Sequence, residues 1–192
     1  MQWREKKLIA SVAVELVQPG NVVGFNGGTT TTAAAHELGI RVSAEPEFDA
    51  GLITVVTNAV NIANDLTYRP QFRVVVTGGV ARPRSFELVG PLAALILPSI
   101  QIDVLFLGVD AIDLTTGAIC ADDEDEAAVN SALMKTSSRT VILADSSKLG
   151  RSAFGRIGTL DERTTVITDG SADPAQIALL RALGTEVLLA QD

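Results

Sequence analysis

A segment rich in glycine and threonine offers the first chemistry that the sequence suggests. It follows the apolar run 22–25 and leads directly into the alanine-rich stretch 32–38. Glycines let a backbone approach an anion closely, hydroxyl groups add donors, and a helix N-terminus has free N–H groups and a favourable dipole. The segment could therefore hold a phosphate. Because it has neither a Walker lysine nor a G-x-G-x-x-G spacing, a tight turn with a threonine N-cap explains it equally well. Its residues are Asn26, Gly27, Gly28, Thr29, Thr30 and Thr31.

Two further polar segments follow apolar runs. Thr57 and Asn58 end the run 52–57 and begin the next helical stretch, where N-capping alone is the simpler explanation. The run 72–77 is followed by a glycine turn and two arginines, in a chain with only 15 basic residues. Guanidinium groups bind phosphate and carboxylate through paired hydrogen bonds, although two arginines on a loop are more often solvated. This second segment contributes Gly78, Gly79, Arg82 and Arg84 as candidate ligand-binding residues.

Charged residues follow two more apolar runs. Asp110 comes after 102–108, where its carboxylate could bind sugar hydroxyls, act as a base, or cap a turn. Lys148 comes after 140–144 and therefore reaches the same sheet edge, where it could pair with a ligand phosphate or with Asp110. The five acids of 122–126 open a helix, where the dipole favours them, and this accounts for most of them. Glu126 is retained as a candidate from that run.

The elements that must position these residues alternate along the chain. The strand-like runs are continuously apolar, as expected of strands covered on both faces, and they alternate with helical stretches. This pattern predicts an α/β fold with a mainly parallel open sheet and helices on both faces, in which ligands bind at the carboxyl ends of the strands. Residues 39–51 are expected to be a polar, mobile surface loop. Strands are predicted at 22–25, 52–57, 72–77, 102–108, 140–144, 164–168 and 186–190, and helices at 4–18, 32–38, 58–67, 124–138 and 174–183.

Composition excludes several classes of function. With one cysteine, Cys120, and one histidine, His36, the chain has no material for an internal disulfide or a zinc site, and neither a metal nor a cofactor is expected. A net charge of −8 opposes binding to a phosphate backbone. Apolar runs fall short of the roughly 20 residues that a membrane-spanning helix needs. A single cytoplasmic domain with no membrane contact is expected over residues 1–192.

The order of these segments carries more information than any one of them. Together they resemble the C-terminal effector-sensing domain of DeoR-type bacterial transcriptional regulators, from about Arg4 to Ala190. The resemblance implies the fold shared by ribose-5-phosphate isomerase, glucosamine-6-phosphate deaminase and CoA-transferases, and a phosphorylated sugar or related metabolite as effector. The segments that carry it are REKKLIASVAVELVQPGNVVGFNGGTTTTAAAHEL, TVVTNAVNIANDL, VVVTGGVARPRSFELVGPLA, VLFLGVDAID, EDEAAVNSALM and VILADSSKLGRSAF.

The resemblance also implies residue roles. The loop 27–31 would hold the phosphate, and Asp110 and Glu126 would face the sugar. Asn26 stands where these regulators commonly have Asp, and Asn130 where they commonly have Lys or Arg, so both positions bear on the identity of the ligand. The same pocket would be surrounded by Thr57, Asn58, Gly79, Arg82 and Lys148.

One loop separates a sensor from an enzyme of the same fold. Ribose-5-phosphate isomerases carry Asp-Gly-Ala-Asp-Glu at a strand end. Aligning 108–110 on its Gly-Ala-Asp places Leu107 at the first acid and Ala111 at the last. Because proton transfer between carbons needs a base and an acid, the two missing acids favour a non-catalytic domain. A sugar-phosphate isomerase or deaminase is the alternative, and a CoA-transferase would need Glu126 as its nucleophile.

The resemblance implies two kinds of partner besides the effector. DeoR-type regulators have an N-terminal winged helix-turn-helix that reads DNA, and no such segment precedes Arg4, so DNA binding is expected only through a domain outside this chain. Either a longer regulator has been truncated, which we favour, or the chain is a stand-alone sensor. Homo-oligomerisation is expected, because an effector alters DNA affinity by binding two quaternary states differently.

Overall fold

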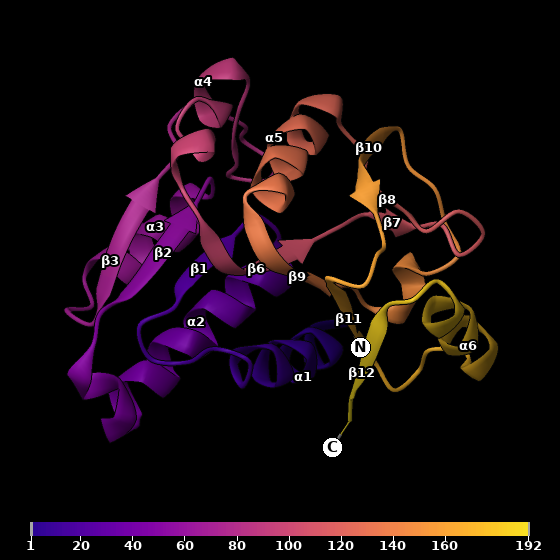
Figure 1. Cartoon of the computed structure of the whole chain (residues 1–192), viewed down its shortest axis with the longest axis horizontal. Helices are drawn as coiled ribbons and strands as arrows, with labels where there is room; N and C mark the ends of the chain where they lie inside the picture. Colours follow the sequence, from indigo (N-terminus) through magenta and orange to yellow (C-terminus); the bar gives the residue numbers. More distant parts are fainter. Residues whose placement is uncertain (1, 192) are drawn as a thin grey trace.

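Seven strands form one parallel sheet in the computed structural model, which describes residues 2–191 (Figure 1). Every neighbouring pair in this sheet is parallel, which confirms the predicted α/β class. All seven predicted strands are present within one or two residues at each end, except that strand 140–144 begins three residues earlier. In sheet order they are β12 (Glu186–Ala190), β11 (Thr164–Asp169), β9 (Ser137–Leu143), β6 (Ile102–Gly108), β1 (Val22–Phe25), β2 (Ile53–Thr57) and β3 (Phe72–Val76).

Helices cover both faces of this sheet, as the continuous apolar runs predict (Figure 1). Successive residues of β6 point to opposite faces: Phe106 packs in the core with α1 (Gln2–Val14), α2 (Thr29–Ala44) and α3 (Val60–Thr67). Its neighbours Leu105 and Leu107 pack in the other core. That second core includes α4 (Pro91–Ala94), α5 (Glu124–Lys135) and α6 (Pro174–Ala182).

The expectation that residues 39–51 form a loop is wrong. Helix α2 continues to Ala44, and a 3-10 turn, η1 (Pro46–Ala50), follows it. Although the segment is polar in composition, α2 has a buried apolar face here, because Leu38 and Val42 lie four residues apart on the side that packs against the core. Arg41 adds anchoring by donating to the carbonyls of Val14 and Val17 at 2.5 and 3.0 Å. Phe48 is buried as well, so the segment packs against the core.

Other helix boundaries differ by a few residues from the predictions. Helix α2 begins at Thr29, three residues early, and α1 ends at Val14 rather than at residue 18. Helix α3 begins at Val60, because Thr57 still belongs to β2 and Ala59, directly before the helix, is in extended backbone. Helix α5 ends at Lys135. The hydroxyl of Ser137, just beyond this end, donates a hydrogen bond to the Leu133 carbonyl at 2.7 Å.

Short antiparallel strands supplement the main sheet. A three-stranded sheet is formed by β7 (Ala111–Ile112), β8 (Ala118–Ala121) and β10 (Gly155–Thr159). A hairpin is formed by β4 (Val80–Ala81) and β5 (Leu88–Val89). The two-residue strands β4, β5 and β7 carry no periodic signal, so the sequence did not predict them. The longer β8 and β10 were not predicted either. Two further 3-10 turns are η2 (Leu97–Ser99) and η3 (Ser146–Lys148).

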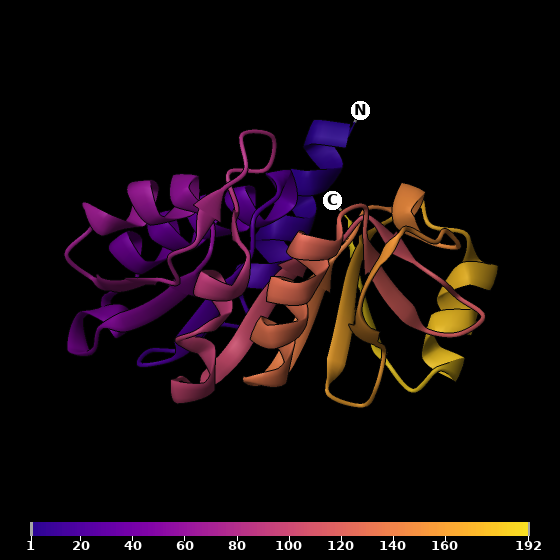
Figure 2. The same ribbon diagram turned by 90° about the horizontal axis from the view of Figure 1, so that it is seen from above.

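The strand order reverses beside β1. The chain proceeds outward from β1 to β2 and β3, and then returns so that β6 pairs with the other side of β1. Ligand sites of open α/β sheets lie at such switch points, outside the carboxyl ends of the strands. The hairpin and the first turn of α1 stand out on the same side of the molecule (Figure 2). Within residues 2–191, no helix is long and apolar enough to cross a bilayer.

Candidate functional site

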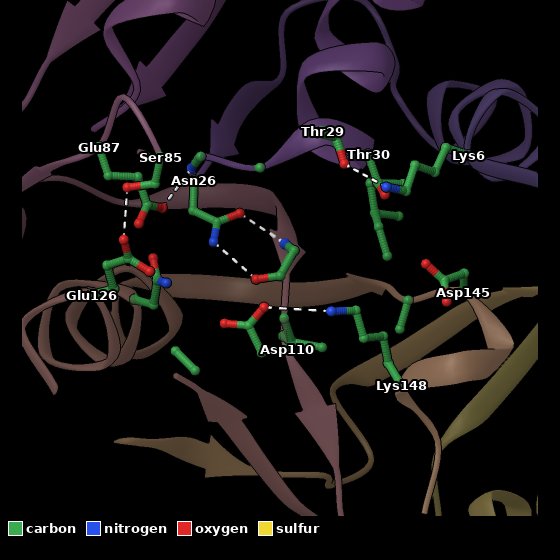
Figure 3. Close-up of a pocket in the computed structure, with 18 residues that line it drawn as sticks. Lys6, Asn26, Thr29, Thr30, Ser85, Glu87, Asp110, Glu126, Asp145 and Lys148 are labelled. Atoms are coloured by element: carbon green, nitrogen blue, oxygen red, sulfur yellow. Dashed lines mark hydrogen bonds and ion pairs between the residues drawn. The ribbon is translucent and has the colours of Figure 1, made fainter. Parts of the chain in front are cut away.

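A pocket of about 180 Å³ lies at this switch point, as the fold predicts (Figure 3). Its walls come from α1, the loop after β1, the N-terminus of α2, the hairpin tip between β4 and β5, the ends of β6, β8 and β9, and helix α5. Eight of the residues singled out from the sequence line it: Asn26, Gly27, Gly28, Thr29, Thr30, Asp110, Glu126 and Lys148.

Asn26 ties the ends of β1 and β6 together. Its side-chain Nδ2 donates to the Gly108 carbonyl at 2.9 Å, and its Oδ1 accepts from the Gly108 N–H at 2.7 Å. This reciprocal pair occupies both ends of the amide, which is almost fully buried. Asn26 therefore fixes the geometry of the pocket floor, a task that needs a donor and an acceptor on one side chain.

Gly27 and Gly28 shape the first loop in different ways. The N–H of Gly27 donates to Oε1 of Glu87 at 2.7 Å, so it is already engaged within the protein. A Cβ on Gly27 would lie 2.3 Å from Cγ of Glu87, and the close approach therefore requires a glycine. Gly28 has φ 128°, a backbone region that favours glycine, and it precedes the first residue of α2.

The N-terminus of α2 faces the pocket beside a lysine from α1. Thr29 and Thr30 begin the helix and line the pocket. Nζ of Lys6 donates to Oγ1 of Thr29 at 2.8 Å, which brings a cation to the helix N-terminus (Figure 3). Thr31 does not line the pocket, because its hydroxyl donates to the Gly28 carbonyl at 3.0 Å and its side chain is buried. Free N–H groups, a helix dipole and an ammonium group together favour an anion.

Asp110 and Lys148 meet across the pocket. Nζ of Lys148 lies 3.5 Å from Oδ1 of Asp110, and both side chains are about one third exposed, at 31% and 33%. Oδ2 of Asp110 accepts from the Asp122 N–H at 2.9 Å. Of the two interactions that the sequence left open for Lys148, the structure contains the one with Asp110. Asp145 stands at the same end, where its side chain accepts from the Ser147 N–H at 3.1 Å.

Glu126 is held by the hairpin tip. Ser85 Oγ donates to its Oε1 at 2.6 Å, and Nε of Arg82 lies 3.1 Å from the same oxygen. Arg82 also pairs with Asp123 through Nη1 at 2.7 Å. Arg82 therefore lies behind Glu126 and does not line the pocket. The guanidinium group of Arg82, a candidate ligand-binding group from the sequence, thus pairs with two carboxylates of the protein instead.

Glu87 is the most perturbed acid of the site. Its side chain is only 2% exposed, and burial together with the nearby charges of Glu126 and Asp110 raises its pKa from 4.5 to about 7, against the opposing hydrogen bonds from Gly27 and Asn58. The preceding residue, Phe86, adopts φ 60°, an uncommon value for a residue with a side chain. Its ring is exposed, whereas the carboxyl group of Glu87 turns inward.

The remaining predicted residues lie outside the pocket. The hydroxyl of Thr57 accepts from the Ala59 N–H at 3.0 Å within a local turn, and Asn58 exchanges hydrogen bonds with Leu88. The N-cap of α3 is Ala59, so neither residue caps the helix. Gly78 and Gly79 have φ 82° and 117° and form the turn before the hairpin. Arg84 lines a wider groove of about 740 Å³ between α1, α2, α3 and the hairpin tip. The structure thus does not bring Thr31, Thr57, Asn58, Gly78, Gly79, Arg82 or Arg84 into the pocket wall.

Several pocket residues were not singled out as site residues from the sequence. Lys6 lies on α1 among other charged residues, so its pattern indicates an exposed helix face. Glu87 and Ser85 lie in a hairpin that has no periodic signal. Asn130 was noted only as a departure from the family pattern, and its spacing of four residues from Glu126 on a helix is a signal that could have placed it here. The newly found lining residues with polar or charged side chains are Lys6, Ser85, Glu87, Asn130 and Asp145.

The lysines and the glutamates of the pocket lie at opposite ends, and the carboxylate of Asp145 shares the lysine end. Figure 3 shows Lys6 and Lys148 at one end and Glu87 and Glu126 at the other, with Asn26 and Asp110 between them. Within residues 2–191, no group of three or more histidine, cysteine, aspartate or glutamate side chains is placed to hold a metal ion. The arrangement suits a small molecule with an anionic group at one end and hydrogen-bonding groups along the rest.

Comparisons with known proteins identify similar sequences. The family model for the DeoR C terminal sensor domain matches residues 1–170. The putative aga operon transcriptional repressor of Escherichia coli O157:H7 is 34% identical over 96% of this chain and 65% of its own length. The HTH-type transcriptional regulator GlpR of Haloferax volcanii is 35% identical over 95% of this chain and 68% of its own length. The chain thus spans about two thirds of the length of these relatives.

Solved structures with a similar fold include enzymes. Ribose-5-phosphate isomerase A of Methanocaldococcus jannaschii aligns with a TM-score of 0.55 and 20% identity, over 74% of this chain and 52% of that chain. A D-ribose-5-phosphate isomerase in complex with phospho-erythronic acid aligns with a TM-score of 0.53 and 17% identity, over 74% of this chain and 52% of that chain. At such identities the likeness concerns the fold alone.

Proposed function

The chain belongs to the DeoR C terminal sensor domain family, and from this membership we propose that it is the effector-sensing unit of a transcriptional regulator with a phosphorylated sugar or related metabolite as effector. The names of the relatives support this proposal, because one is a putative operon repressor and the other an HTH-type transcriptional regulator. One of them, the glycerol-3-phosphate regulon repressor of Escherichia coli K12, is 28% identical over 95% of this chain. We take residues 1–192 to form one sensor unit.

The observation that carries the proposal is the meeting of Lys6 with the N-terminus of α2. Lys6 contacts Thr29 at 2.8 Å, and Thr30 lines the same end of the pocket. A phosphate there would accept hydrogen bonds from backbone N–H groups of the first helical turn and pair with the ammonium group. Lys148 stands nearby, held at 3.5 Å from Asp110, and could turn from that carboxylate to the phosphate. The Gly27 N–H is left out of this role, because it is engaged by Glu87.

The regulatory consequence requires parts outside this chain. In a full-length regulator, an effector can alter the affinity for DNA only by binding two states of the regulator with different affinities. From membership of this family we propose a homo-oligomer whose DNA contacts come from a separate winged helix-turn-helix domain. The 192-residue chain itself, with a net charge of −8, would contribute little attraction to DNA.

A non-catalytic pocket is the preferred interpretation, because two of its acids are engaged in structural interactions. Asp110 pairs with Lys148 and accepts from Asp122, and Glu126 is held by Ser85 and Arg82. One observation favours an isomerase or deaminase as second candidate: the pKa of Glu87 is raised to about 7, near the value that suits a general base. Turnover of ribose-5-phosphate or glucosamine-6-phosphate by the purified chain, lost in Glu87→Gln, would establish that candidate.

A thermal-shift screen tests the proposed function. Phosphorylated sugars should raise the melting temperature of the chain, whereas the same sugars without phosphate should not, because ligands that bind the native state stabilise it. Lys6→Ala should abolish the shift. Lys7→Ala is the matched control, because this neighbouring lysine of the same helix lies outside the pocket. Absence of a shift with every phosphorylated compound would overturn the proposed function.

A further inference from the structure

We propose that Glu87 is the specificity-determining residue of the pocket: together with Glu126 and Asn130 it selects phosphorylated ligands whose far end carries hydroxyl or ammonium donors, and it excludes ligands with a second anionic group there. This inference rests on the proposed function, because it assumes that the phosphate occupies the end with Lys6. It adds the chemical class of the other end of the effector.

The two ends of the pocket differ in what they can offer a ligand. The end with Lys6 and Lys148 offers two ammonium groups and the N-terminus of α2, beside the Asp145 carboxylate, which accepts from the Ser147 N–H at 3.1 Å. The opposite end presents the carboxyl groups of Glu87 and Glu126 (Figure 3). A ligand that spans the pocket must therefore present an anion at one end and groups compatible with carboxylates at the other.

Glu87 is held in place and cannot turn away from a ligand. Its side chain is 98% buried, and the Gly27 N–H donates to its Oε1 at 2.7 Å. The absence of a side chain at Gly27 is what allows this approach, because a Cβ would lie 2.3 Å from Cγ of Glu87. The loop that contains Gly27 leads to the phosphate end of the pocket, and it packs directly against the carboxyl group of Glu87 at the opposite end. A fixed, desolvated carboxyl group discriminates strongly between donors and acceptors.

Asn130 supplies an independent indication that this end receives donors. Its side chain is 2% exposed and lines the pocket, yet its Oδ1 has no hydrogen-bond partner among residues 2–191. Asn130 and Glu126 are four residues apart on α5 and therefore share a face of the helix. A buried acceptor without a donor costs free energy, and most such groups in proteins are satisfied. A ligand hydroxyl or ammonium group beside Glu126 would satisfy this one.

The cation nearest to this end is already engaged. Arg82 lies 3.1 Å from Glu126 and 2.7 Å from Asp123, and it does not line the pocket. The hydroxyl of Ser85 is likewise directed at Glu126, at 2.6 Å. A ligand carboxylate at this end would therefore face two carboxyl groups and an unpartnered amide oxygen, with no donor left to meet it from Arg82 or Ser85. Like charges and unmatched acceptors both oppose such a ligand.

The test compares phosphorylated ligands that differ only at the far end. Glycerol-3-phosphate and 3-phosphoglycerate form a three-carbon pair, and sorbitol-6-phosphate and 6-phosphogluconate form a six-carbon pair. In each pair an alcohol is replaced by a carboxylate. Titration calorimetry with the full chain at pH 8 should show that at least one alcohol binds more tightly than its matched acid by about tenfold or more. Neither acid should bind more tightly than its alcohol.

Glu87→Gln separates a specificity role from a structural one. A merely structural role would weaken both members of a pair equally and leave their ratio unchanged. We expect the ratio to fall by about tenfold in Glu87→Gln, because the amide removes the charge and offers donors. Glu126→Gln should lower the ratio as well and gives a second measurement if Glu87→Gln folds poorly. Glu162→Gln, on an exposed loop, should leave the ratio as it is.

The outcomes distinguish this inference from the proposed function. Equal binding of the alcohol and the acid, a preference for the acid, or an unchanged ratio in both glutamine variants would overturn the role of Glu87 and leave the phosphate site standing. Failure of every phosphorylated compound to bind would overturn the proposed function and this inference with it.

Discussion

The backbone N–H of Gly27 donates a 2.7 Å hydrogen bond to Oε1 of Glu87, which joins the loop after β1 to the tip of the hairpin. These two residues are 60 positions apart in the chain. Their contact has two consequences: the loop cannot use this N–H for a ligand, and the hairpin tip is fixed against the pocket floor. The glycine is needed for space, because its φ is not among the positive values of the loop.

Gly27→Ala should therefore destabilise the domain through a steric clash with Glu87. A Cβ would lie 2.3 Å from Cγ and 2.9 Å from Cδ of Glu87, so one of the two segments must move. We expect a loss of about 1–3 kcal/mol in the free energy of unfolding, measured by urea denaturation. Gly51→Ala is the control, because the nearest atom to a Cβ there is 3.9 Å away.

A double-mutant cycle identifies the cause of that loss. Glu87→Ala removes every atom that the new Cβ would contact within 3.0 Å. In that background Gly27→Ala should cost clearly less, and the coupling energy should be about 1 kcal/mol or more. Additive losses would mean that Gly27 is required for a reason other than its approach to Glu87.

Glu87 should also make the stability of the domain depend on pH. Its pKa is raised from 4.5 to about 7 by burial, by Glu126 and by Asp110. Between these values the native state holds a proton that the unfolded state has released, so stability falls as the pH rises through this window. Below pH 4.5 the contribution is fully retained, and above about pH 7 the loss levels off. At about 1.4 kcal/mol per pH unit, the total is on the order of 3 kcal/mol.

Glu87→Gln isolates this contribution, because glutamine imitates the protonated acid and still accepts from Gly27. The variant should match the wild type near pH 4.5 and become the more stable protein as the pH approaches 7.5. Comparing the two by urea denaturation at several pH values cancels the titration of the other acids. Glu162→Gln should show no such trend, and a constant difference across the range would contradict a raised pKa at Glu87.

The sequence predicts the sheet and the strand-end residues of this site better than the side chains that the hairpin and α1 contribute to it. Parallel strands, the switch point and the strand-end residues follow from continuous apolar runs, and the structure brings Asn26, Asp110 and Lys148 together on that basis. Glu87 was not predicted, because it lies between β4 and β5, which have only two residues each. Lys6 was not predicted, because it lies on a helix whose contact with α2 is a matter of tertiary packing. Periodicity reports on elements of several residues and carries no information about such contacts.

The arginines show a second limit. Both arginines of the hairpin were candidates for anion binding, since guanidinium groups suit phosphate and carboxylate alike. The structure gives Arg82 two protein carboxylates, Asp123 and Glu126, and directs Arg84 to a different groove. Which anion an arginine binds depends on what the fold places beside it, and residue type alone does not decide this.

Asn26→Asp should weaken the junction of β1 and β6. The substitution removes the donor to the Gly108 carbonyl, now bonded at 2.9 Å, and places a carboxylate oxygen against that carbonyl. At neutral pH we expect a loss of about 1–3 kcal/mol, measured by urea denaturation. Part of it should return on acidification, because a protonated carboxyl group can donate to the carbonyl again. Asn64→Asp, on the exposed side of α3, should cost little and show no such recovery.

Asp110→Asn should strengthen the binding of inorganic phosphate. Asp110 now holds Lys148 at 3.5 Å, so a phosphate must compete with this carboxylate for the ammonium group and also approach its charge. The amide keeps an oxygen that can accept from the Asp122 N–H, which Oδ2 binds at 2.9 Å, so the loop should retain its shape. The expected gain is roughly three- to tenfold in Kd, because the pair is partly exposed and solvent screens it. Titration calorimetry at fixed ionic strength measures it.

Asp125→Asn removes the same charge from an exposed position on α5 outside the pocket and should change the Kd far less. If Asp110→Asn leaves phosphate affinity unchanged, Lys148 takes no part in binding the phosphate, and Lys6 with the N-terminus of α2 must account for it.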